Sequence, residues 1–334
     1  MDDKILLAHG SGGRLSHELV KRFLVKGLNN PLLGRLDDSA VFDLQGRLAF
    51  TTDSYVVTPV FFPGGDIGRL AVCGTVNDLS MAGAVPLFLT LSLILEEGLP
   101  IADLDAILDS VRKTSDEAGV DIVTGDTKVV DRGSADRIFI NTSGIGLVPT
   151  GVDISSGNCR VEDRVLLSGP IGEHGIALLG CREGLTFESS LESDCAPLNR
   201  LVRDMIDASR DIHALRDPTR GGLASTLNEF AENSGVGIRI EEEAVPVHPQ
   251  VAAVCELMGL DPLYVANEGK LVAVVSPEDA ERVLRRMQRN RYATQARIIG
   301  EIVSDHPGRV VMKTRLGTTR IVDMITGELL PRIC

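Results

Sequence analysis

Five aspartates lie in separate short motifs of the sequence, and their chemistry indicates a site for a hard metal cation. They are Asp38, Asp53, Asp78, Asp126 and Asp217. No histidines or cysteines accompany them at the spacing of a zinc site, and carboxylate oxygens are the ligands that Mg²⁺ prefers in proteins. We therefore expect Mg²⁺ at some of these carboxylates.

Two of these aspartates occur where an unpaired charge is costly. Asp53 lies in Leu48–Val57, which predicts a strand, and aspartate is depleted in strands. Asp78 and its neighbour Asn77 lie in Ile67–Ala84, a predicted helix that is apolar or small nearly all round and is therefore expected to be buried. A buried charge must be paired or bind a metal, so we favour a functional role over that of a helix-end cap.

Residues 121–130, Asp-Ile-Val-Thr-Gly-Asp-Thr-Lys-Val-Val, predict a strand, a turn at Gly125–Lys128 and a second short strand. The turn carries an acid, a hydroxyl and a base in Asp126, Thr127 and Lys128. That combination suits Mg²⁺ together with phosphate. The spacing differs from that of the P-loop.

Residues 217–224, Asp-Pro-Thr-Arg-Gly-Gly-Leu-Ala, predict the start of a helix. Gly221 and Gly222 at a helix N-terminus, beside Thr219 and Arg220, form a good anion site because the first N–H groups of a helix have no partner within it. A plain helix cap is the alternative interpretation.

Glu268 belongs to a third polar motif, Asn-Glu-Gly at 267–269. It precedes Leu271–Val275, an apolar run that predicts a buried strand. A carboxylate held at the end of a core strand is a candidate general base, and a simple turn acid is the alternative.

The last residue of the sequence is a cysteine, Cys334. Chain ends are usually mobile unless they are tied down, so a thiol there suits a carrier that swings a loaded group into a pocket. The alternative is that one of six cysteines merely falls last, since the reactivity of a thiol depends on its surroundings. A prenylation box is excluded because it needs the cysteine four residues from the end.

Composition narrows the class of protein. The chain has 334 residues, 43% of them hydrophobic, which is enough for two domains with a sizeable core. Its 34 basic and 47 acidic residues give a net charge of -13, which argues against nucleic acid or an anionic membrane as the main partner but not against ATP held through metal ions. The widely spaced cysteines, without a C-x-x-C pair, indicate a cytoplasmic protein with reduced thiols.

Hydrophobic periodicity predicts mixed α and β structure throughout the chain. A boundary rich in Gly, Ser, Thr and Pro at 149–158 divides it. We expect an N-terminal domain at 1–150, which includes a Gly-rich segment at 1–45, a C-terminal α/β domain at 151–318, and a mobile tail at 319–334. The expected elements that position the motifs are strands at 88–95 and 138–148, and helices at 103–119, from 173 onward, and at 198–209.

The motifs together resemble the HypE family of [NiFe]-hydrogenase maturation factors, within the superfamily of aminoimidazole ribonucleotide synthetase and selenophosphate synthetase. The resemblance covers essentially the whole chain. It rests on the three motifs above, the terminal Pro-Arg-Ile-Cys at 331–334, and His-Gly-Ser-Gly-Gly-Arg (9–14), Asp-Asp-Ser-Ala (37–40), Thr-Thr-Asp-Ser-Tyr-Val-Val (51–57) and Val-Asn-Asp-Leu-Ser-Met-Ala-Gly-Ala (76–84). It implies two mixed α/β domains of the aminoimidazole ribonucleotide synthetase type, followed by a flexible tail.

The resemblance also implies a reaction and its partners. Cys334 would receive a carbamoyl group from a HypF-type carbamoyltransferase. ATP-dependent dehydration would convert this S-carbamoyl group to S-cyano, and the cyanide would pass to iron on a HypC–HypD complex. Two subunits would pair through their N-terminal domains, with the ATP sites near the interface.

The resemblance further implies roles for residues. The five aspartates would hold Mg–ATP in some combination, and Lys128 and Glu268 would be the acid/base or charge-stabilising pair at the carboxamide. The implied nucleotide contacts are Gly12, Gly13, Thr52, Asn77, Thr127, Lys128, Thr219, Arg220, Gly221 and Gly222.

Three alternatives stay open at the level of sequence. A selenophosphate synthetase would need a reactive cysteine or selenocysteine in the N-terminal Gly-rich loop, which has none at 9–13. A thiamine-phosphate kinase would have no use for Cys334. A nucleotide-regulated carrier would present Cys334 to partners without catalysing a reaction.

Overall fold

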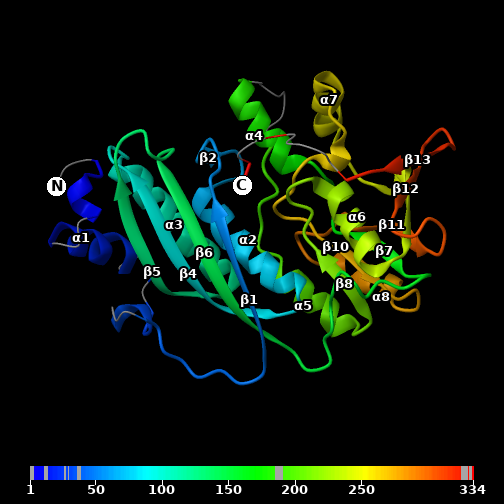
Figure 1. The fold of residues 1–334 in the computed structure, drawn as a ribbon, viewed down its shortest axis with the longest axis horizontal. Helices are drawn as coiled ribbons and strands as arrows, with labels where there is room; N and C mark the ends of the chain where they lie inside the picture. Colours follow the sequence, from blue (N-terminus) through cyan, green and yellow to red (C-terminus); the bar gives the residue numbers. More distant parts are fainter. Residues whose placement is uncertain are drawn as a thin grey trace.

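The chain folds into two lobes that lie side by side, with the C-terminus between them (Figure 1). The computed structural model describes residues 4–10, 14–25, 28, 30–35, 39–184, 191–324, 330 and 333–334. Within these residues, no helix combines the length and apolar character that a bilayer crossing requires.

A four-stranded sheet forms the centre of the N-terminal lobe. Its strands are β1 (Arg47–Tyr55), β6 (Ile138–Val148), β4 (Val85–Glu96) and β5 (Asp121–Val130), in that spatial order. β6 is antiparallel to both β1 and β4, whereas β4 and β5 are parallel. The smaller elements are η1 (Leu7–Gly10), α1 (Arg14–Leu19), η2 (Val20–Val25), η3 (Leu33–Arg35), β2 (Phe61–Phe62) and β3 (Gly65–Asp66).

Two helices, α2 (Ile67–Met81) and α3 (Ile101–Ala118), cover one face of this sheet. The Asp66 carboxylate caps α2 by accepting the N–H groups of Gly68 and Arg69 at 2.7 and 2.9 Å. α3 ends at Gly119, whose φ of 75° is the left-handed conformation that favours glycine. Both predicted helices and the strands predicted at 88–95 and 138–148 are confirmed.

The predicted turn at Gly125–Lys128 is wrong, because these residues lie inside the continuous strand β5. A Cβ on Gly125 would stand 2.1 Å from the Leu91 carbonyl oxygen of β4. The glycine therefore permits a close approach of two backbones just after the register shift between Leu89 and Thr90. Sequence alone does not separate this use of glycine from a turn.

The C-terminal lobe contains a seven-stranded sheet in the order β13-β12-β9-β11-β7-β10-β8, antiparallel except for the β12–β9 pair. Its strands in chain order are β7 (Arg164–Leu167), β8 (Ile212–Arg216), β9 (Gly237–Glu241), β10 (Val272–Val275), β11 (Arg297–Val303), β12 (Val310–Lys313) and β13 (Thr319–Val322). The helical elements are α4 (Glu173–Glu183), α5 (Asn199–Ala208), α6 (Gly222–Ser234), η4 (Glu242–Ala244), α7 (Pro249–Met258), η5 (Pro262–Tyr264) and α8 (Ala280–Met287).

One apolar core joins the two lobes. It runs from α2 and α3 of the first lobe through α5 to α8 and one face of the second sheet. A separate core fills the space between α6 and the other face of that sheet. Because α2 packs directly on α5, the residues at the boundary of the lobes are held in fixed relative positions.

The C-terminal boundary differs from the expected one. A tail was expected from residue 319, whereas Thr319–Val322 form β13 and pair with β12. The last two residues are also packed against protein, with Ile333 only 5% exposed in the core that joins the lobes.

Candidate active site

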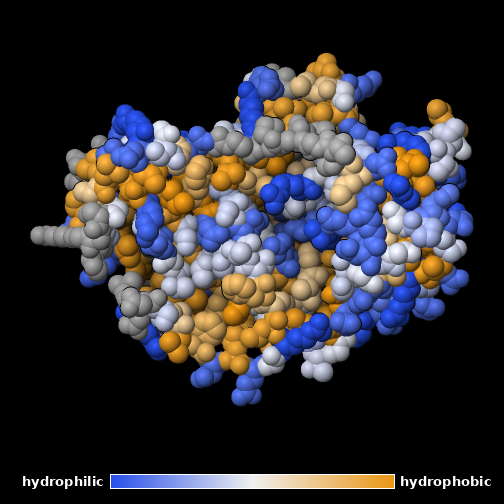
Figure 2. Space-filling view, in the orientation of Figure 1, coloured by the Kyte–Doolittle hydropathy of each residue, from blue (hydrophilic) through white to orange (hydrophobic). Residues whose placement is uncertain are grey.

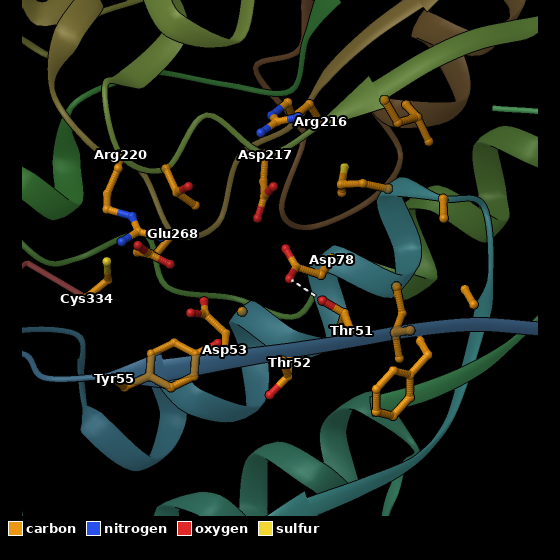
Figure 3. Close-up of a pocket in the computed structure, with 18 residues that line it drawn as sticks. Thr51, Thr52, Asp53, Tyr55, Asp78, Arg216, Asp217, Arg220, Glu268 and Cys334 are labelled. Carbon is orange, nitrogen blue, oxygen red and sulfur yellow. Dashed lines mark hydrogen bonds between the residues drawn. The ribbon is translucent and has the colours of Figure 1, made fainter. Parts of the chain in front are cut away.

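A cavity of about 470 Å³ opens between the two lobes, and it collects most of the motifs that carry chemistry (Figure 3). β1 and α2 form one wall, the loop after β8 forms the opposite wall, and the loop before β10 and the last residue close one end. The polar, ionisable and thiol side chains that line it are Thr51, Thr52, Asp53, Tyr55, Asp78, Arg216, Asp217, Thr219, Arg220, Glu268 and Cys334.

Three of the predicted aspartates, Asp53, Asp78 and Asp217, face one another in this cavity. Thr51 donates a hydrogen bond to Asp78 (Oγ1 to Oδ2, 2.9 Å). Burial raises the pKa of Asp78, and the nearby Asp53 charge adds to the effect. Burial and then the Asp78 charge raise the pKa of Asp217 to about 7. The group is therefore a set of mutually repelling acids that a cation would stabilise.

The donor set fits Mg²⁺ held jointly by protein and nucleotide. Among the described residues, no three acidic, histidine or cysteine side chains are close enough together to hold a metal by themselves. Mg²⁺ characteristically uses one or two carboxylates together with phosphate oxygens and water, so a pair drawn from Asp53, Asp78 and Asp217 meets its need. Bound there, Mg²⁺ would neutralise phosphate charge. Asp38 lies outside the described residues.

Glu268 and Cys334 lie together at one end of the cavity, beside Arg220 (Figure 3). Glu268 is 3% exposed, and its buried Oε1 has no hydrogen-bond partner within the described part of the chain. Burial, with Cys195 as the next contribution, raises the pKa of Glu268 well above its usual value. Burial and then the Glu268 charge raise the pKa of Cys334 to about 12, while Arg220 opposes this shift. The thiol is therefore protonated at neutral pH in this position.

The Glu268 backbone is fixed by a neighbour that the sequence did not identify. The Asp194 carboxylate accepts the N–H groups of Glu268 and Gly269, both at 3.1 Å. Asp194 is itself paired with the buried Lys270 at 3.3 Å, and Lys270 Nζ also lies 2.8 Å from Glu173. Lys270 directly precedes the apolar run Leu271–Val275, and a lysine at the start of a predicted buried strand was a usable signal that an acid lies nearby.

The predicted nucleotide contacts divide into two groups. Thr52, Thr219 and Arg220 line the cavity. Gly221 and Gly222 begin α6 in left-handed conformations, with φ of 77° and 60°, and do not belong to the lining. A Cβ on Gly222 would come within 2.6 Å of a carbonyl oxygen of η5, so close packing of backbone requires this glycine.

Asn77 joins the lobes and does not line the cavity. Its side chain is 1% exposed, donates to the Ala196 carbonyl at 3.1 Å and accepts the Leu198 N–H at 2.8 Å. The residue satisfies backbone groups at the boundary of the lobes, which explains a polar side chain in a buried helix.

Asp126, Thr127 and Lys128 line a second cavity, of about 380 Å³, within the N-terminal lobe. Lys128 Nζ lies 2.6 Å from Asp126 Oδ2, and this contact lowers the pKa of the Asp126 carboxyl. A single chain therefore does not bring Lys128 to Glu268. The remaining predicted contacts, Gly12 and Gly13, lie outside the described residues.

Sequence reasoning missed the roles of Thr51, Tyr55 and Arg216 in the cavity wall. Thr51 and Tyr55 share the face of β1 that carries Asp53, because side chains two residues apart in a strand point the same way. The two-residue period of the strand could therefore have identified Thr51 and Tyr55 from the sequence. Tyr55 fits because residue 74 is glycine, where a Cβ would stand 2.2 Å from the tyrosine oxygen. Arg216 gave no comparable signal.

Comparison with known proteins agrees with this architecture. Family models for the N-terminal and C-terminal domains of AIR synthase related proteins match residues 36–148 and 160–313. The chain is 53% identical over 333 residues to carbamoyl dehydratase HypE of Rhizobium leguminosarum bv. viciae, covering 99% of this chain and 95% of that protein. The chain belongs to the HypE family. The HypE of Bradyrhizobium diazoefficiens is likewise 53% identical, over 98% of this chain and 95% of that protein.

Solved HypE structures share the fold and confirm the predicted α/β class. A crystal structure of hydrogenase maturation protein HypE in complex with ATP has a TM-score of 0.96 at 49% identity, covering 98% of this chain and 99% of that chain. A HypE–HypF complex has a TM-score of 0.82 at 49% identity, covering 92% and 99%. HypE proteins are carbamoyl dehydratases by name, and this chain is an enzyme of that family.

Proposed function

We propose that this HypE-family chain dehydrates a carbamoyl group on Cys334 to a thiocyanate at the expense of ATP, and so supplies cyanide for the iron of [NiFe]-hydrogenase. The observation that carries the proposal is the position of Cys334 in the cavity between the lobes. It lies across from three carboxylates and beside Glu268, whose Oε1 has no hydrogen-bond partner among the described residues. A loaded thiol in this place would meet a base and a metal–phosphate site at once.

The reaction needs an activated oxygen, because oxide is a very poor leaving group. The carbonyl oxygen of the S-carbamoyl group attacks the γ-phosphorus of ATP, and ADP leaves. Two protons then leave the nitrogen, the carbon–oxygen bond breaks, and phosphate departs as the carbon–nitrogen triple bond forms. The balance is one S-carbamoyl group and one ATP giving one S-cyano group, ADP and phosphate.

The lining residues suit these steps. Glu268 accepts a proton from the nitrogen, and its raised pKa makes the ionised carboxylate a stronger base. Arg220 lies beside Glu268 and Cys334 (Figure 3), where its guanidinium would stabilise the charge that develops on the activated oxygen. A pair drawn from Asp53, Asp78 and Asp217 would hold the magnesium ion of the nucleotide, and Thr219 would contact its phosphates.

Lys128 belongs to this scheme only if a second subunit contributes it. It stands opposite Ile94 on the sheet face turned away from α2 and α3. The same face of β1 exposes Leu48 and Phe50, the latter 70% exposed, and Figure 2 shows hydrophobic side chains gathered over this lobe. We propose that this face pairs in a homodimer, which would carry Lys128 toward the partner's nucleotide.

Loading and delivery require other proteins. A HypF-type carbamoyltransferase is the proposed donor, in keeping with a HypE–HypF complex known for a relative. A HypC–HypD complex is the proposed acceptor of cyanide. Cys334 is half-buried at one end of the cavity, and we propose that the tail leaves the cavity for loading and returns for the reaction.

The deciding experiment follows the mass of the C-terminal peptide. The protein is incubated with a carbamoyl donor, its carbamoyltransferase and Mg–ATP. We expect an adduct on Cys334 that loses one water only when the ATP is hydrolysable. An adduct that never loses water would assign a carrier function instead, and the absence of any adduct with a competent donor enzyme would refute the role of Cys334.

A further inference from the structure

A buried histidine on α4 contacts the end of the chain. His174 is fully buried, and its Nε2 lies 2.7 Å from the carbonyl oxygen of Ile333. Its Nδ1 lies 2.8 Å from Ser193 Oγ. The ring of Phe62 stacks edge-on against the imidazole, with centroids 5.6 Å apart and planes at 89°. The imidazole is therefore held in position on three sides.

The hydrogen-bond partners define the state of this ring. A carbonyl oxygen only accepts, so Nε2 carries the hydrogen and donates to Ile333. Nδ1 is then an acceptor, and the Ser193 hydroxyl donates to it. Ser193 Oγ in turn accepts the Cys195 N–H at 3.1 Å, so its own hydrogen is free to point at the ring. Burial lowers the pKa of His174 and keeps the ring neutral.

The tail is held from both lobes. His174 holds the Ile333 carbonyl from the C-terminal lobe, and the Val56 N–H, just after β1, donates to the Cys334 oxygen at 3.1 Å. The Ile333 side chain is buried between the lobes. These contacts fix the backbone on both sides of the Cys334 amide and leave the Cβ–Sγ arm to reach toward Glu268 and Arg220.

We propose that His174 is a positioning residue that holds the docked tail by its main chain and thereby places the Cys334 sulfur at Glu268. Because the contact is to a backbone carbonyl, it is indifferent to what the sulfur carries. The tail can therefore dock in the same register as thiol, S-carbamoyl or S-cyano. The significance for turnover rests on the proposed function, whereas the docking contact itself does not.

The test compares His174→Gln with His174→Asn. The amide nitrogen of glutamine reaches the place of imidazole Nε2 and restores a donor toward Ile333. That of asparagine reaches only the place of Nδ1. Alkylation of Cys334 by iodoacetamide is followed by mass spectrometry of the C-terminal peptide, without nucleotide, donor or partner. Cys181, exposed on the same helix, is the internal control for an intact α4.

We expect His174→Asn to raise the alkylation rate of Cys334 roughly three- to tenfold, the equivalent of one lost hydrogen bond. His174→Gln should stay close to wild type, and Cys181 should be unchanged in both. Equal Cys334 rates in the two variants would overturn the proposal.

If α4 itself is disturbed, so that Cys181 also reacts faster, Ser193→Ala decides the matter. It leaves the α4 sequence intact and removes the hydroxyl that holds the imidazole ring at Nδ1. Faster alkylation of Cys334 alone would support the proposal, and an unchanged rate would refute it. Because no substrate is present, a failure of the dehydratase assignment would not alter these outcomes.

With substrate, the same pair of variants supplies a kinetic readout. His174→Asn should lower the rate of water loss from the carbamoylated peptide while the rate of carbamoyl loading does not fall. His174→Gln should restore water loss. A variant that slows both steps equally would contradict a role confined to docking.

Discussion

The cavity between the lobes and the cavity inside the N-terminal lobe both contain aspartates that the sequence motifs identify, yet the pKa values of these aspartates are shifted in opposite directions. In the first, burial and neighbouring acids raise the pKa values of Asp78 and Asp217. In the second, Asp126 is 60% exposed and paired with Lys128, and its pKa is lowered. The negative charge of the aspartates is therefore uncompensated in the cavity between the lobes, whereas Lys128 neutralises that of Asp126 in the second cavity.

The comparison shows which carboxylates lack a neutralising partner and would be stabilised by a cation. An exposed pair contributes little to stability, because solvent already screens both charges. Facing acids in a cavity carry a cost that a metal–phosphate complex can remove. Substitutions in each cavity can distinguish two cavities that act separately from two cavities whose residues act together across a dimer interface.

The largest expected effect belongs to Glu268. Glu268→Gln keeps the volume and removes the base, so turnover should fall by about 10²–10⁴-fold. Nucleotide-induced thermal stabilisation should persist, since the carboxylates that hold the metal remain. Glu256→Gln on the exposed face of α7 removes one negative charge at a distance and is the matched control. Wild-type turnover in Glu268→Gln would eliminate Glu268 as the base.

Next in size is a test of Lys128 across subunits. Lys128→Ala should lower turnover and spare ATP binding. When Lys128→Ala and Glu268→Gln chains are refolded together, half of the dimers are mixed and each has one intact site, so about a quarter of wild-type activity should return. Activity that stays at the level of the parent variants would show that the two cavities do not meet at an interface.

Asp217→Asn should change the pH dependence of stability. The folded pKa of Asp217, about 7, lies above the unfolded value of about 3.9, so the folded state binds the extra proton. Wild-type stability should therefore fall as pH rises from about 4 to about 7, and the variant should flatten this slope. Urea denaturation without Mg²⁺ or nucleotide measures it. An unaltered slope would mean that Asp217 is not the titrating group.

The smallest effect is expected for Asp126→Asn. The wild-type pKa is lowered by Lys128, so its contribution is present above the unfolded pKa and disappears as pH falls through the folded value. Because the pair is exposed, the free energy of unfolding at neutral pH should drop by less than about 1 kcal/mol. The same urea series measures this. A loss well above 1 kcal/mol would show that solvent does not screen this pair, and the contrast between the two cavities would then fail.

Periodicity and local chemistry were sufficient for much of the chain. The helix at α2, the helix at α3 with its glycine end, and the strands β4 and β6 followed from patterns three to four or two residues apart. These patterns depend on contacts between near neighbours, which the sequence displays directly. The motif residues Asp53, Asp78, Asp217, Thr219, Arg220 and Glu268 were found in the same way and do line one cavity.

Three-dimensional packing determined which of these side chains enter the cavity, and the motifs did not predict that. The sequence presents Asn77 and Asp78 as one polar pair, but the α2 axis turns Asp78 into the cavity and Asn77 into the boundary between the lobes. Gly125 permits a close strand pairing where a turn was expected. Cys334, expected on a mobile end, is docked in this structure, where the Ile333 carbonyl lies 2.7 Å from Nε2 of His174, a residue outside every sequence motif. The sequence thus determined which residues carry chemistry, and long-range packing determined which of them meet, because burial and partners are properties of contacts between distant segments.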